Sequence, residues 1–95
     1  MSKKDAYIKK MKAQLDEWSA EIDRLQAQAK KAEAGLELEY QNKIEEAKSL
    51  RMAAHKKLEE IKQAGNDTWE ELKVGLESAW QELESALTKV RSQFQ

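Results

Sequence analysis

The chain has no proline, no cysteine and only three glycines among its 95 residues. Because proline and glycine supply most tight turns, their scarcity excludes a loop-rich or disulfide-stapled fold. The absence of cysteine removes thiolate metal ligands and suits a reducing compartment. No apolar run reaches membrane-spanning length, and the first residues lead into an amphipathic pattern rather than a signal peptide. We therefore expect a single domain over residues 1–95, located in the cytoplasm.

The residues that are abundant favour helix. Charged residues make up 37% of the chain and hydrophobic residues 40%. Ala, Leu, Glu, Lys and Gln dominate, and these side chains lose least on entering an α-helix. The composition therefore predicts an all-α protein of the coiled-coil type.

A single apolar stripe follows the first two thirds of the chain at helical spacing. On a helical projection its members fall within an arc of about 120°. They are Ile8, Met11, Leu15, Trp18, Ile22, Leu25, Ala29, Ala32, Leu36, Tyr40, Ile44, Ala47, Ala54, Leu58 and Ile61. The unbroken phase predicts one continuous helix over residues 3–64.

Residues 64–70 interrupt this pattern. Gly65 suits the position after a helix end, and Asp67 can cap a new helix with Glu70 three residues on. A second, sharply amphipathic helix is predicted over residues 67–94. Its apolar members are Trp69, Leu72, Leu76, Trp80, Leu83, Leu87, Val90 and Phe94.

A turn at this point predicts an antiparallel helical hairpin in which large side chains face small ones. The predicted pairs are Trp80 with Ala54, Leu87 with Ala47, Val90 with Ile44, and Phe94 with Tyr40. Gly35 leaves an alternative open, because a break there would give a three-helix bundle. The continuous helix is the favoured interpretation, since the apolar phase passes through the glycine and no capping residue precedes residue 36.

A continuous first helix would be about 90 Å long, against about 40 Å for the second. Its N-terminal half would then lack a partner within the chain. We therefore expect a homo-oligomer, or an assembly with another helical protein.

The sequence offers no catalytic, cofactor-binding or metal site. His55 is the only histidine, and Lys56 and Lys57 beside it would repel a cation. Adjacent carboxylates such as Glu45 and Glu46 point about 100° apart on a helix. With no glycine-rich phosphate loop and no continuous basic surface, we expect neither an enzyme with a small-molecule substrate nor a nucleic-acid-binding protein.

The best candidates for partner contact lie on the second helix and at Trp18. The tryptophans suit either a core or a partner surface. The small residues Thr68, Gly75, Ala79 and Ala86 form an edge that would permit close approach of a second subunit. The predicted interaction residues are Trp18, Trp69, Leu72, Gly75, Leu76, Ala79, Trp80, Leu83 and Leu87.

Several segments together resemble a group of short bacterial coiled-coil proteins. They are YIKKMKAQLDEW at 7–18, EIDRL at 21–25, the stretch 40–46, WEELKVG at 69–75 and AW at 79–80. The resemblance spans nearly the whole chain. It implies a bacterial cytosolic helical protein without catalytic residues, and some members are labelled as stress-response proteins.

Two functions follow as hypotheses. The first is a non-enzymatic coiled-coil scaffold or protein-interaction module that self-associates. The second is a peripheral protein that opens and lays the amphipathic face of residues 69–94 on a membrane surface. The acidic polar face of residues 67–84 disfavours the second hypothesis, because it would repel anionic lipids.

Overall fold

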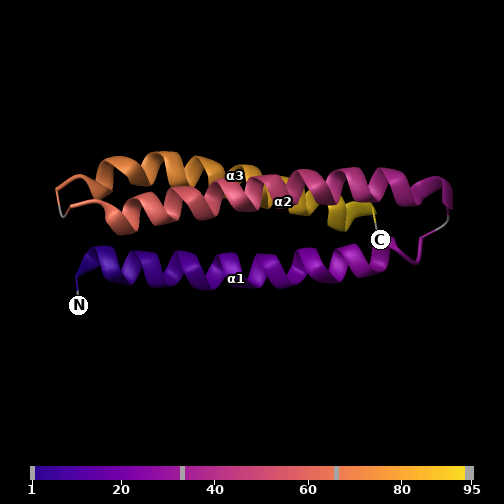
Figure 1. Ribbon diagram of the computed structural model, residues 1–95, viewed down its shortest axis with the longest axis horizontal. Helices are drawn as coiled ribbons and strands as arrows, with labels where there is room; N and C mark the ends of the chain where they lie inside the picture. Colours follow the sequence, from indigo (N-terminus) through magenta and orange to yellow (C-terminus); the bar gives the residue numbers. More distant parts are fainter. Residues whose placement is uncertain (1, 33, 66, 94–95) are drawn as a thin grey trace.

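The computed structural model contains three helices: α1 (Lys3–Ala29), α2 (Ala34–Gln63) and α3 (Trp69–Gln93). It describes residues 2–32, 34–65 and 67–93, and the regular elements within these ranges are all helical. Successive helices run in opposite directions and form a bundle of 51 × 20 × 18 Å (Figure 1). The all-α prediction is confirmed.

The prediction of one continuous helix over residues 3–64 is wrong. The chain leaves the helical path after Ala29 and resumes it at Ala34, so the first predicted helix is two helices. The break precedes Gly35, which lies inside the first turn of α2. The three-helix alternative therefore has the right number of helices but assigned the break to the wrong residue.

Burial explains why the chain turns despite its helical preference. The fold-back buries six α1 side chains: Met11, Leu15, Trp18, Ile22, Leu25 and Ala29. Full burial of a large apolar side chain contributes roughly 1.5–3 kcal/mol. Opening a few helical hydrogen bonds costs only about 1 kcal/mol each. The free energy gained by burying α1 outweighs the free energy lost in the helical hydrogen bonds. The fold-back also removes the difference in helix length from which oligomerisation was predicted.

The ends of α1 are closed by local hydrogen bonds. The Ser2 hydroxyl accepts from the Asp5 amide at 3.1 Å, which caps the N-terminus. At the other end the amides of Lys31 and Ala32 donate to carbonyls three residues earlier, at 3.0 and 3.1 Å. This tightening of the last turn lets the chain leave the helix without a glycine.

The turn between α2 and α3 lies where the sequence predicted it, but its hydrogen bonds differ from the predicted cap. The Gly65 carbonyl accepts from the amides of Thr68 and Trp69, at 3.2 and 3.3 Å, and from the Thr68 hydroxyl at 3.3 Å. Helix α3 begins at Trp69, and Asp67 lies in the turn before it. Gly65, rather than a cap at Asp67, organises this turn among the described residues.

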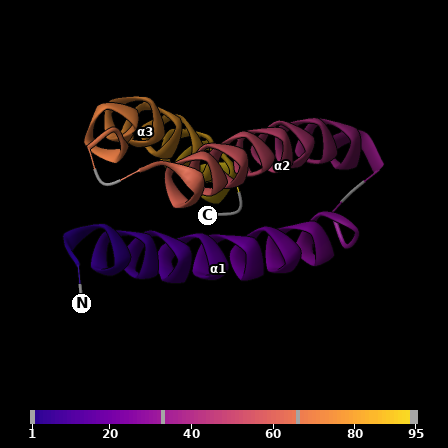
Figure 2. The ribbon, with the colours of Figure 1, turned by 60° about the vertical axis from the view of Figure 1, so that its left-hand side comes forward.

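The core lies between all three helices, and the residues described as buried are all hydrophobic. Besides the six α1 residues it contains Ile44, Ala47, Ala54, Leu58 and Ile61 from α2, and Trp69, Leu76, Ala79, Trp80, Leu83, Ala86, Leu87 and Val90 from α3. A second view shows α1 along one side of the α2 and α3 pair (Figure 2).

Two members of the predicted stripe are exposed. Leu36 is 42% exposed and Leu72 is 38% exposed. Leu36 lies in the first turns of α2, and Leu72 lies near the start of α3. Phe94, and with it the predicted Phe94–Tyr40 pair, falls outside the described residues.

Candidate functional site

The apolar face of α3 has two edges, and each edge contacts a different helix. The edge that faces α2 carries Gly75 and Ala86, and Ala86 lines a groove with Glu46 and Leu50 of α2. Ala79 falls on the same edge by helical spacing, and both alanines are buried. A β-carbon at Gly75 would lie 3.7 Å from Nζ of Lys57 on α2. Three members of the small edge predicted as an inter-subunit contact, Gly75, Ala79 and Ala86, therefore pack within the chain, whereas Thr68 is exposed in the turn before α3.

The other edge of α3 is aromatic and faces α1. The Trp18 and Trp80 rings lie 5.5 Å apart between centroids, and the Tyr7 and Trp69 rings lie 5.7 Å apart. Both pairs are tilted, at 43° and 44°, which is a favourable arrangement for aromatic rings. We call this set the aromatic seam. Its bulky rings hold α1 and α3 together in parallel.

Charged side chains cover the Tyr7 end of the aromatic seam. Lys73 Nζ lies 4.9 Å from the centre of the Tyr7 ring and 5.5 Å from that of Trp69, which gives cation–π contacts to both. The Tyr7 hydroxyl donates to Glu77 at 3.4 Å. The pKa of Tyr7 is raised to about 12, first by burial and then by the charge of Glu77 and the hydrogen bond to it.

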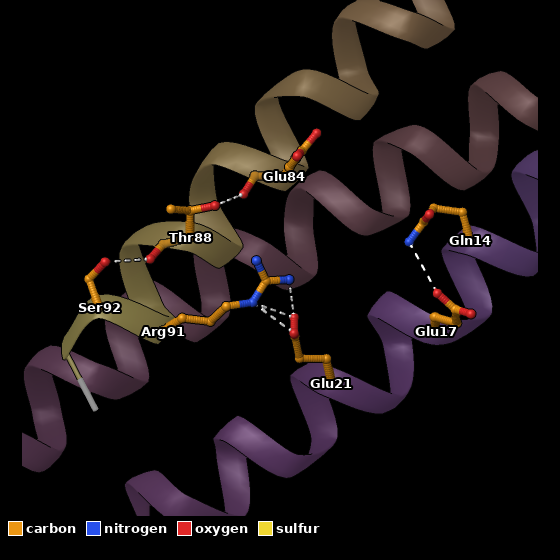
Figure 3. Close-up of polar contacts among 7 residues, drawn as sticks. All are labelled: Gln14, Glu17, Glu21, Glu84, Thr88, Arg91 and Ser92. Carbon is orange, nitrogen blue, oxygen red and sulfur yellow. Dashed lines mark hydrogen bonds and ion pairs between the residues drawn. The ribbon is translucent and has the colours of Figure 1, made fainter. Parts of the chain in front are cut away.

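An ion pair closes the opposite end of the seam. The Arg91 guanidinium reaches from α3 to Glu21 on α1, and Nε lies 2.8 Å from each carboxylate oxygen (Figure 3). The pKa of Arg91 is raised, chiefly by these hydrogen bonds to Glu21. Because the Arg91 side chain is 41% exposed, solvent screening limits the pair to about 1 kcal/mol or less.

A third polar contact joins the start of α1 to the end of α2. The Lys4 ammonium donates to the backbone carbonyl of Ala64. A cation at this position satisfies an otherwise free carbonyl and interacts favourably with the negative end of the α2 dipole. Together with the seam, this contact anchors α1 along its whole length.

Most of the predicted interaction residues are buried within the chain. Trp18, Trp69, Leu76, Ala79, Trp80, Leu83 and Leu87 are at most 9% exposed. Gly75 is half-buried, and Leu72 is exposed. These residues meet one another in the bundle, so they reach a partner only if the bundle opens.

The apolar side chains that face solvent are different ones. In the described part of the chain the large exposed hydrophobics are Leu36, Leu38, Met52, Leu72 and Val74. The sequence analysis did not single out Leu38, Met52 or Val74, because each lies outside the apolar stripe. Leu36 and Leu38 lie two residues apart in the first turns of α2, and Leu72 and Val74 lie two residues apart near the start of α3.

Grooves lie between pairs of helices on the surface of the bundle. A groove of about 380 Å³ lies between α1 and α3 along Lys10, Met11, Gln14, Trp18, Trp80 and Glu84. His55 lies on the outer α1–α2 surface with Asp16 and Arg51. Residues 2–32, 34–65 and 67–93 contain no group of three histidine or acidic side chains that could hold a metal ion.

Sequence reasoning missed the charged side chains that surround the aromatic seam. Glu21, Lys73, Glu77 and Arg91 look like ordinary surface charges, because their partners lie on another helix about 60–70 residues away in sequence. Only the register of α1 against α3 reveals them.

Comparison of the chain with protein-family models, with curated proteins and with solved structures found no match. Among the helices that the structure describes, none is both long and apolar enough to cross a membrane.

Proposed function

We propose that this chain is a non-enzymatic helical scaffold that associates with other copies of itself. The observation that carries the proposal is the apolar start of α2, where Leu36 is 42% exposed and Leu38 is 70% exposed. The two side chains point about 200° apart on the helix, so one interface can cover one of them, and full burial of a leucine contributes roughly 1.5–3 kcal/mol toward association.

The register of the bundle supports this choice of surface. The Tyr40 hydroxyl donates to the backbone carbonyl of Gln93 at 3.2 Å, so the end of α3 lies level with Tyr40. The first turns of α2 project beyond Gln93, and Figure 1 shows them extending past the end of α1 as well. A second copy is the natural cover for a helical end that its own chain leaves bare.

Light scattering behind a sizing column tests the proposal, over concentrations from low micromolar to near millimolar. We expect the mass to rise from 11.0 kDa toward twice that value. The double variant Leu36→Gln with Leu38→Gln should weaken association by about tenfold or more, since about 1.4 kcal/mol corresponds to a factor of ten.

Val74→Gln is the matched control, because Val74 is 73% exposed on α3, away from the first turns of α2. Its association should equal that of the unchanged chain. A constant mass of 11.0 kDa at every concentration would overturn the proposal. A role in a stress response rests on the sequence resemblance alone.

The membrane hypothesis requires the bundle to open. The apolar face of α3 that would lie on lipid is buried, with Leu76, Leu83 and Leu87 at 0% exposure. Vesicle flotation distinguishes the two functions. Association with zwitterionic or anionic vesicles, together with loss of the aromatic seam, would favour the membrane hypothesis over the scaffold.

A further inference from the structure

The link between α1 and α2 is built from residues that favour helix. Lys30, Lys31 and Ala32 are among the better helix formers, and in the described ranges no residue has a positive φ. The apolar stripe also keeps its phase across the link, from Ala29 to Leu36. Apart from Gly35, in the first turn of α2, the local sequence favours a straight helix here, so we attribute the bend to the burial of α1.

The register of α1 against α2 has its centre in the first turn of α2, directly after this link. Lys4 contacts Ala64, and Leu15 and His55 line the same outer groove. The residue numbers of facing positions therefore sum to roughly 69, as expected for two antiparallel helices. The midpoint falls between residues 34 and 35. Two straightened chains related by a two-fold axis at that point would face each other in the same register.

We infer that the partner of this chain is a second copy that exchanges α1. In the exchanged dimer α1 and α2 form one long helix, and α1 of each copy packs on the α2–α3 pair of the other. The contacts between α1 and α3 recur between copies, including the ring pair of Trp18 and Trp80 and the ion pair of Glu21 and Arg91. The inference rests on the proposed function, and it specifies how the copies associate.

The exchange gains contacts that the single chain lacks. Residues of the link regain helical hydrogen bonds, and the half-exposed Leu36 comes to face the partner's link. The opposing cost is the entropy of association, which falls with rising concentration. Closed monomers should therefore dominate in dilute solution and exchanged dimers in concentrated solution.

Charges near the midpoint complement each other in this arrangement. On a straight helix, the face by which α1 and α2 meet contains Ile8, Leu15 and Leu58. Lys30 and Glu37 lie on the same face, and all five residues fall within an arc of about 80° on the helical projection. The two-fold axis places Lys30 of one copy within about one turn of Glu37 of the other. Lys30 is exposed and Glu37 half-buried in the single chain, so both are accessible for this pairing.

Cross-linking distinguishes exchange from contact between closed bundles. The chain has no cysteine, so Glu21→Cys with Arg91→Cys provides two unique thiols, one on α1 and one on α3. A short bismaleimide should join them within one chain in dilute solution. In concentrated solution it should join two chains, giving a covalent species of twice 11.0 kDa.

The pair Glu39→Cys with Gln93→Cys is the matched control. These side chains lie 3.3 Å apart between α2 and α3, which stay together in both forms, so cross-links should remain within one chain at every concentration. If light scattering shows dimers while the Glu21 and Arg91 positions still link within one chain, exchange is overturned and self-association stands. If no dimers form at all, both proposals fail.

Linker variants provide a second test. Inserting Gly-Ser-Gly-Ser after Ala32 should interrupt the long helix and reduce dimer formation by tenfold or more. The same insertion after Gly65 lengthens the α2–α3 turn and should leave the dimer unchanged. Equal dimerisation of the unchanged chain and the first insertion would overturn the exchange.

Discussion

Replacement of Trp18 by alanine tests whether α1 packs on α3. Trp18 is 8% exposed, and its ring lies 5.5 Å from that of Trp80. Truncation of a buried Trp costs about 3–5 kcal/mol, from lost transfer free energy and from the cavity left behind. A domain of this size has a total stability of roughly 5–10 kcal/mol. The variant should therefore lose about half of its stability or more.

Urea unfolding followed by circular dichroism measures this loss, at one low chain concentration for all proteins. Val74→Ala is the control, because Val74 is 73% exposed and its truncation should change stability by less than about 0.5 kcal/mol. Trp80→Ala and the double variant complete a cycle, with a coupling of roughly 0.5–1.5 kcal/mol expected for the aromatic pair. A loss below about 1 kcal/mol for Trp18→Ala would refute the packing of α1 on α3.

Three further predictions concern single positions. Gly75→Ala should stabilise the protein by roughly 0.5–1 kcal/mol, because alanine favours the helical conformation more than glycine does. The added β-carbon would meet only the flexible Lys57 side chain, at 3.7 Å. A lower melting temperature would contradict the spacing between α2 and α3. Ala54→Trp should cost on the order of 1–3 kcal/mol, since Ala54 is 0% exposed, and near-neutral melts would argue against a filled core there. The raised pKa of Tyr7 favours the neutral phenol in the folded state, so its contribution to stability is complete below pH 10 and is lost as pH rises through about 12. Ultraviolet titration should show a late tyrosinate step that Tyr7→Phe removes, and the absence of a late step that depends on Tyr7 would contradict the contact with Glu77.

The sequence correctly indicated which side chains avoid water but not how often the chain reverses. The stripe from Met11 to Ile61 is buried almost as predicted, because helical periodicity depends only on local geometry. The reversal before Gly35 was missed because the link consists of helix formers. Its conformation is set by contacts between residues far apart in sequence.

The surfaces of α3 also show what the sequence indicated and what it left undetermined. Spacing identified a small edge on the helix that begins at Trp69 and placed Trp69 and Trp80 on its apolar face. It did not indicate which neighbouring helix either feature contacts. The tertiary structure placed the small edge against α2 and the aromatic edge against α1, and thereby buried residues that had been assigned to a partner.

By itself, then, the sequence determined that the chain is helical, where its apolar face runs and that a turn lies near Gly65. Those features follow from backbone propensity and side-chain spacing within a few residues. Only the tertiary structure decided the fold-back after Ala29, the pairing of Trp18 with Trp80 and the exposure of Leu36. Each of these three features depends on the free energy gained when segments far apart in sequence bury one another, and a local sequence pattern does not report that free energy.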